Sequence, residues 1–246
     1  FAKLMTRRAR QMGMEQSTFA NSNGWPATGQ RMSMRDLAIL ANRLHADFPE
    51  FYPMFAEKEF LFDEKESQNR FNRNPLLGLG IGADGLKTGH TSEAGYGLVG
   101  SAKQGDRRIF FAITGLPTAK ARAEESEAIV NWAFRQFAAK TLIKAGTPVA
   151  QAQVSMGRNA TVPLVPAEDV RLLLPIFADD TVPAEFVYSG PVAAPIAKDQ
   201  ALGTLIISPE GMPQVTVPLY AGNDVGKGGF FVRLRGAASS LLGQAG

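Results

Sequence analysis

Two segments near the start of the chain carry the signals of helices. Residues 2–12 are helical in composition, and residues 14–29 are rich in Asn, Ser, Gly and Pro, which indicates a loop. Ser33 lies three residues before Asp36, an N-capping arrangement ahead of a run rich in Leu and Ile. We therefore expect a second helix that ends near Ala46.

A third helix is expected from Glu124 onward, where apolar residues recur with the helical period. Acidic residues occupy its first turn and Lys140 its last, an arrangement that the helix dipole favours. Its predicted apolar side consists of Ala128, Ile129, Trp132, Ala133, Gln136 and Phe137.

The stretch between the second and third helices has the alternating pattern of strands. A short strand is expected at residues 58–62, and three more at residues 85–88, 96–102 and 107–114. Residues 103–106 contain a glycine, which can adopt a positive φ, and they form a plausible hairpin turn between the last two strands. Together these strands predict an antiparallel meander.

After residue 146 the pattern changes to short runs of Val, Leu and Ile between Pro, Gly, Asp and Asn. Strands are expected around Gln153 and at residues 162–165, 170–174, 186–188, 202–207 and 215–219. This predicts an all-β module of about 80 residues. We accordingly expect three parts: residues 1–142, residues 143–228 and a tail at residues 229–246.

The tail has the pattern of an amphipathic helix. Two interpretations stay open: the helix docks on the β module, or it associates with a membrane surface through residues 230–244, with Phe and Arg at the level of the headgroups. No apolar run in the sequence approaches the roughly 20 residues that a membrane-spanning helix needs.

The amino-acid composition excludes several kinds of catalytic and metal site, but it says little about the fold. The chain has no cysteine and two histidines, His45 and His90, which excludes disulfides, thiol catalysis and cysteine-ligated zinc and predicts a protein without metal or other cofactor. A net charge of +3 does not indicate a nucleic-acid partner. The sequence starts Phe-Ala-Lys-Leu-Met, so we expect it to be internal to a longer protein.

Lys87, Thr88 and Gly89 form the tripeptide with the clearest chemical meaning. Beside an active-site serine, the lysine would supply positive charge, the threonine a hydroxyl for a substrate carboxylate, and the glycine room for the substrate backbone. A tripeptide also recurs by chance, and the alternative is a hairpin end with a solvated lysine.

The residues around this tripeptide make it specific. Residues 84–102 (DGLKTGHTSEAGYGLVGSA) strongly resemble the Lys-Thr-Gly region of low-molecular-weight penicillin-binding proteins, the D-alanyl-D-alanine carboxypeptidases. Further matches are residues 12–25 (MGMEQSTFANSNGW), the helix at 34–44, the strand at 57–62, the NRN turn at 72–74 and RAEES at 122–126. The β module and the tail are similar to the family's second domain and membrane anchor.

The resemblance implies an α+β fold: the C-terminal part of a β-lactamase/transpeptidase-like domain, then a small all-β sandwich-like domain and a C-terminal amphipathic helix. It also implies serine-type acyl transfer on a peptidoglycan pentapeptide that ends in D-Ala-D-Ala, with β-lactam antibiotics as inhibitors. The implied location is the periplasm, with peripheral attachment to the inner membrane.

Only one of the family's three motifs is present. No serine has lysine three residues later, and Ser67-Gln68-Asn69 fits Ser-x-Asn but lies just before the Lys-Thr-Gly strand, so we treat it as coincidence. We therefore expect no nucleophile in this chain, which would be the C-terminal portion of a longer protein. The nucleophile segment would be cut off, disordered or a separate chain.

Roles are carried over only to matching positions. Lys87 would polarise the site and shuttle protons, Thr88 would bind the substrate carboxylate, and Gly89 would permit close approach. The backbone N–H of His90 would donate to the oxyanion. Arg122 would add charge-assisted recognition of the carboxylate, or else pair with Glu125 or Glu127 in its own helix.

Two other function classes stay open. A β-lactamase shares the Lys-Thr-Gly motif, although the β module and the tail argue against it. A non-catalytic peptidoglycan-binding or scaffolding protein would use the same cleft without turnover, and it describes a chain without nucleophile well.

Overall fold

The computed structural model describes residues 1–62, 65, 67–178 and 181–230, and the chain divides between Gln136 and Phe137 into two compact units. The division falls earlier than the boundary expected after residue 142, because residues 137–143 form a strand of the second unit. The predicted tail lies outside the described residues from residue 231 onward. Both interpretations of it therefore stay predictions.

The first unit contains helices on the two faces of a three-stranded sheet. Its elements are α1 (Ala2–Gln11), α2 (Met34–Asp47), the 3₁₀ turns η1 (Tyr52–Ala56) and η2 (Ser67–Arg70), β1 (Ala83–Thr91), β2 (Gly95–Gln104), β3 (Arg107–Leu116) and α3 (Ala119–Gln136). The sheet is antiparallel with the order β1-β2-β3. The predicted meander is thereby confirmed, and Gly105 in the second turn has a φ of 57°.

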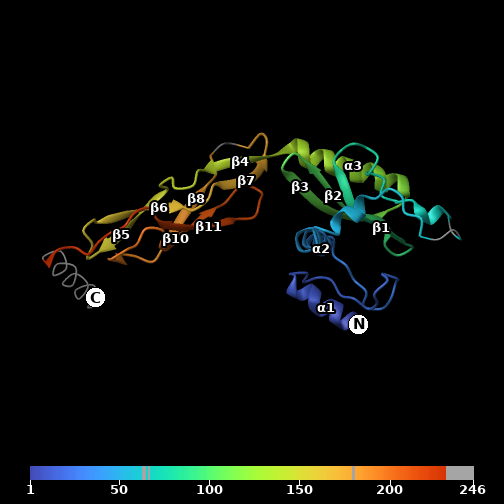
Figure 1. The fold of residues 1–246 in the computed structure, drawn as a ribbon, viewed down its shortest axis with the longest axis horizontal. Helices are drawn as coiled ribbons and strands as arrows, with labels where there is room; N and C mark the ends of the chain where they lie inside the picture. The colour runs from blue at the N-terminus through green and yellow to red at the C-terminus, as the bar shows by residue number, and fades with distance from the viewer. Residues whose placement is uncertain (63–64, 66, 179–180, 231–246) are drawn as a thin grey trace. The chain divides into compact units, whose positions relative to one another are not determined.

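The sheet separates two apolar clusters because successive strand residues face opposite sides. Leu98 and Phe111 pack with Val130 of α3 on one face. Val99 and Phe110 pack on the other face, against α2 and η1. Figure 1 shows α3 and α2 on the two sides of the sheet. The mixed α+β class expected from the sequence is confirmed.

The start of α2 agrees with the sequence signal. The Ser33 hydroxyl accepts a hydrogen bond from the backbone N–H of Asp36 at 3.1 Å, which caps the helix. The carboxylate of Asp36 is buried and accepts from the backbone N–H of Gln16 at 2.8 Å. This bond ties the loop after α1 to the first turn of α2.

The bounds of α3 differ from the prediction at both ends. The helix begins at Ala119, not near Glu124, because the hydroxyl of Thr118 accepts a hydrogen bond from the N–H of Ala121 at 3.0 Å and caps it. It ends at Gln136, so Lys140 lies in a strand. Trp132, expected on the apolar side, is 57% exposed.

The strand expected at residues 58–62 is reduced to one bridge between Glu59 and Phe71. Backbone hydrogen bonds from Phe60 to Arg70 and from Asn72 to Lys58 flank that bridge. Two short segments are thus held side by side without a ladder long enough to form a strand.

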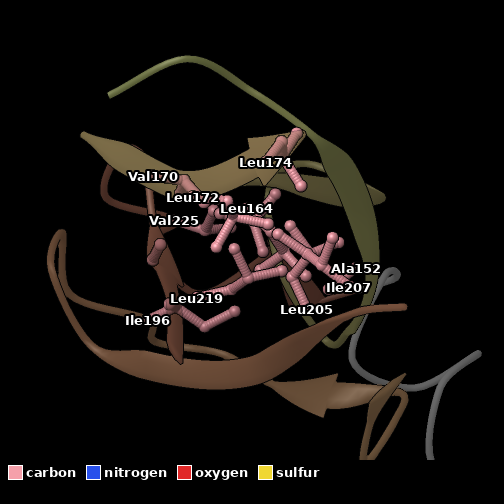
Figure 2. Packing of buried hydrophobic residues seen from close by; sticks show 12 residues of the cluster. Ala152, Leu164, Val170, Leu172, Leu174, Ile196, Leu205, Ile207, Leu219 and Val225 are labelled. Carbon is pink, nitrogen blue, oxygen red and sulfur yellow. The ribbon is translucent and has the colours of Figure 1, made fainter. Parts of the chain in front are cut away.

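The second unit is an all-β sandwich-like module. Its strands are β4 (Phe137–Ile143), β5 (Ala150–Ser155), β6 (Thr161–Pro166), β7 (Val170–Pro175), β8 (Ala184–Tyr188), β9 (Val192–Ala193), β10 (Ala201–Ile207) and β11 (Val215–Ala221). Six of them form one sheet in the order β8-β10-β11-β6-β5-β9, and β4 pairs with β7. Leucines of the larger sheet, such as Leu164 and Leu219, pack against Leu172 and Leu174 of β7 (Figure 2).

No strand was expected at β4 or β9. Residues 137–143 continue the apolar pattern that predicts α3, and β9 has only two residues, which pair parallel with β5.

Within the part of the chain that the structure describes, no helix has the length and hydrophobicity required to cross a membrane.

Candidate active site

Strand β1 places Lys87, Thr88 and Gly89 on the edge of the sheet, since β2 is the only strand of the described residues that pairs with it. The side chain of Lys87 lies on the exposed side and that of Thr88 is largely buried, as the alternation of a strand requires. A Cβ atom built on Gly89 would meet no atom within 4 Å. The surface over Gly89 therefore has room for a ligand.

The side chains of His90 and Arg122 both lie near the ring of Tyr96. Tyr96 pairs with His90 across β1 and β2, and their ring centroids lie 3.9 Å apart. The guanidinium of Arg122, at the start of α3, lies 5.7 Å from the centre of the Tyr96 ring. The fold thus brings Arg122 close to the end of β1, where His90 lies three residues after Lys87.

Arg122 does not form the alternative pairs expected in its own helix. Among the ion pairs of the described residues, none joins Arg122 to Glu125 or Glu127. Its Nη2 lies 3.5 Å from the backbone oxygen of Arg73, and its buried Nε has no hydrogen-bond partner among the residues that the structure describes. A buried N–H group without a hydrogen-bond partner lowers the stability of the fold. This guanidinium is therefore suited to bind an anion, to which it can donate hydrogen bonds.

Arg73 is a neighbour of the site for which no role is predicted from the sequence. Partial burial lowers the pKa of the Lys87 ammonium below its usual value, and the charges of Arg73 and Arg122 lower it further. The Lys87 Nζ donates to the backbone oxygen of Thr88 at 2.6 Å. Arg73 lies in the NRN turn, which is one of the sequence matches to the family. That match was the signal from which a role of Arg73 in the site could have been predicted.

Replacing Arg73 by glutamine should raise the pKa of Lys87 toward its ordinary value, because one of the cations that disfavour its charged form is removed. The ¹³Cε shift of Lys87 in lysine-labelled protein measures this pKa, and the Lys87→Arg variant assigns the signal. Arg43→Gln on α2, where Arg43 pairs with Asp47, is the matched control. An unchanged titration in Arg73→Gln would contradict the assignment.

The arrangement is a cationic surface on an open strand edge. Arg73 and Arg122 lie close enough to Lys87 for their charges to act on it, and carboxylates are bound by such charged donors. No group of three or more His, Asp or Glu side chains among the described residues could hold a metal ion. Two cavities of about 360 and 250 Å³ are lined by residues of the second unit alone.

Two family models match the chain in sequence. Residues 1–118 match the model described as D-alanyl-D-alanine carboxypeptidase, and residues 137–227 match the C-terminal domain of penicillin-binding protein 5. The chain belongs to the low-molecular-weight penicillin-binding proteins. The family expected from residues 84–102 is therefore confirmed.

Individual members of this penicillin-binding protein family align with nearly the whole chain. The D-alanyl-D-alanine carboxypeptidase DacC of Escherichia coli is 35% identical over 236 residues, which cover 95% of this chain and 58% of that protein. DacA of Haemophilus influenzae is 32% identical, and the alignment covers 95% of this chain and 60% of that protein. The chain thus spans about three fifths of the length of these relatives.

A solved structure of the same family has a similar fold. Penicillin-binding protein 5 from Haemophilus influenzae superposes with a TM-score of 0.73 and 32% identity, over 92% of this chain and 66% of that one. Both units of the chain therefore have counterparts in known penicillin-binding proteins.

Proposed function

We propose that this chain provides the carboxylate-binding side of a serine-type D-Ala-D-Ala carboxypeptidase that trims peptidoglycan stem peptides. The observation that carries the proposal is the approach of Arg73 and Arg122 to Lys87 of the Lys-Thr-Gly segment, in a chain of this family. A D-Ala-D-Ala peptide ends in a carboxylate, the group that such cations recognise.

Each residue of the site has a part in the proposed reaction. Thr88 and Arg122 bind the terminal carboxylate, and the open surface over Gly89 admits the substrate backbone. Lys87 adds positive charge, and its lowered pKa makes it easier to pass a proton to or from the reacting groups. The backbone N–H of His90 donates to the oxyanion of the tetrahedral intermediate.

We place the nucleophile in residues outside this sequence, since none of its serines has lysine three residues later. In the complete protein, that serine attacks the carbonyl of the D-Ala-D-Ala bond, D-alanine leaves, and water hydrolyses the acyl-enzyme. This chain by itself is inactive.

Substrate, inhibitors and location follow from the same proposal. The substrate is a peptidoglycan pentapeptide, and β-lactam antibiotics acylate the same serine. The protein then acts in the periplasm, where its substrate is, and the proposed attachment to the inner membrane is through residues 230–244.

Release of D-alanine tests the proposed recognition. The complete protein should release D-alanine from a peptide that ends in D-Ala-D-Ala and should act poorly on the same peptide with a C-terminal amide, because Arg122 and Thr88 then lose the carboxylate. Arg122→Ala should raise KM for the acid peptide and reduce the preference over the amide. Equal turnover of both peptides by the unaltered protein would overturn the proposal.

A non-catalytic peptidoglycan-binding role is the second candidate, favoured by the absence of a Ser-x-x-Lys motif from this sequence. The same assay separates it, because a scaffolding protein would bind the peptide without releasing D-alanine. Rapid turnover of a penicillin, with no release of D-alanine, would instead indicate a β-lactamase.

A further inference from the structure

A partly buried polar network lies at the start of β1, beside the residues of the site and separate from them. The Tyr52 hydroxyl lies 2.6 Å from the Ser101 hydroxyl, and Ser101 donates a hydrogen bond to the carboxylate of Asp84. The Arg108 guanidinium pairs with Asp84 at 2.7 Å and 2.8 Å through two nitrogens. Because the Ser101 proton points to Asp84, the Tyr52 hydroxyl is the donor in its bond to Ser101.

The network joins four segments that are distant in sequence. Tyr52 belongs to η1, Asp84 to β1, Ser101 to β2 and Arg108 to β3. The ring of His45 from α2 packs edge-on against Tyr52 at 4.8 Å. The network therefore connects η1 to all three strands of the sheet.

Asp84 occupies a bulge. Ala83 pairs with Ala102 and Gly85 pairs with Ser101, so Asp84 has no partner in β2. A bulge inserts one residue into a strand and redirects its side chain, and bulges are frequent next to active sites. Here the bulge turns the Asp84 carboxylate toward Ser101 and Arg108, three residues before Lys87.

The next residue of β1 is fixed as well. Asn74 donates its side-chain N–H to the backbone oxygen of Gly85 at 2.9 Å. A Cβ on Gly85 would lie 3.2 Å from the Tyr52 hydroxyl and 3.4 Å from Phe55, so η1 packs closely against the backbone there. The strand is thus held from several sides two residues before Lys87.

Within the part of the chain that the structure describes, β1 has a neighbouring strand on one side only. It is the edge strand of the sheet, and the side chains of Lys87 and His90 are exposed. The position of Lys87 relative to the rest of the site therefore depends strongly on how the strand is anchored at its start.

Asp84 is ionised in this network. Burial would raise the pKa of its carboxyl, but the hydrogen bonds from Arg108 and Ser101 and the charge of Arg108 hold that pKa below the usual value. A well-packed apolar pair often stabilises a protein as much as a buried ion pair does. What an apolar pair does not supply is the fixed direction of these hydrogen bonds.

We propose that Tyr52, Ser101, Asp84 and Arg108 form a positioning network that sets the placement of the Lys87–Gly89 segment for acyl transfer, an inference that rests on the proposed function. None of the four is a catalytic residue. They act through the backbone of β1, whose first residues they hold.

Two hydroxyl deletions in buried serines provide the test. Ser101→Ala in the complete protein should slow acylation by penicillin by about tenfold to a hundredfold, the loss that a small misplacement of reacting groups causes. Ser126→Ala is the matched control, because Ser126 is equally buried and its hydroxyl has no hydrogen-bond partner in the described part of the chain. Its acylation rate should be unchanged. Equal rates in the two variants would overturn the proposal.

An apolar replacement separates positioning from mere stability. The double variant Asp84→Leu with Arg108→Met should regain most of the thermal stability that Asp84→Leu alone loses. Its acylation should stay slow, because directional hydrogen bonds are not restored. Recovery of both stability and rate would show that the network only stabilises the fold.

Amide resonances of residues 87–90 make the test independent of activity. Ser101→Ala should shift or broaden them, and Ser126→Ala should not. If the unaltered protein does not acylate, the proposed function fails, and these resonances still decide the positioning network. Unchanged resonances in Ser101→Ala would refute it. Tyr52→Phe, which removes only a hydroxyl, supplies the same readout where a variant does not fold.

Discussion

Replacing Lys87 by alanine in the complete protein should slow acylation by a fluorescent penicillin by about 10² to 10⁴-fold, the range typical for loss of a proton-transferring or charge-stabilising group. The Lys87 ammonium donates a hydrogen bond to the backbone oxygen of Thr88, and its lowered pKa suits proton transfer. The second-order rate constant of acylation measures the effect, with the melting temperature of each variant recorded beside it.

Two other variants define what the loss means. Lys103→Ala removes an exposed lysine from β2 of the same sheet and should leave the rate unchanged. Arg122→Ala should act mainly on substrate binding and so raise KM more than it lowers kcat. An acylation rate of Lys87→Ala within a few-fold of the unaltered protein would refute the role given to Lys87.

The largest stability effect is expected in the second unit, where β7 carries two adjacent leucines in opposite environments. Leu174 is 1% exposed and packs in the core of the sandwich (Figure 2), whereas Leu173 is 42% exposed. Leu174→Ala should lower the free energy of unfolding by about 2 to 5 kcal/mol, because it removes buried methyl groups and leaves a cavity. Leu173→Ala should change it by about 0.5 kcal/mol or less.

Hydrogen exchange of the amides in β6 and β11 is the suitable measurement, because both tryptophans of the chain, Trp25 and Trp132, lie in the first unit. Protection of these strands should fall in Leu174→Ala and be retained in Leu173→Ala. Equal losses in the two variants would mean that the core is not where the structure places it.

Local signals in the sequence predicted much of this fold. The capping serine of α2 and the period-two pattern of β1 to β3 are set by neighbouring residues, and the structure has both elements at the expected places. The end of α3 was not predictable in this way. Residues 137–143 continue an apolar pattern, and they become a strand because β7 offers a partner from a distant part of the chain.

The residues of the site also differ in whether a local sequence pattern predicts them. Lys87, Thr88 and Gly89 are adjacent in sequence, so a motif finds them, and Arg122 follows from the resemblance of its helix start. Arg73 and the network around Asp84 are assembled from segments far apart in the chain. No local pattern marks such residues, since their meaning depends on which strands and turns the fold brings together.

We propose that this chain holds one side of an acyl-transfer site whose serine lies outside its sequence. Labelling with fluorescent penicillin, followed by digestion and mass spectrometry of the labelled peptide, tests that claim directly. We predict that the complete protein carries the adduct on a serine with lysine three residues later, in a peptide outside this sequence, and that a polypeptide of these 246 residues alone acquires no label. An adduct on any residue of this sequence would contradict the account.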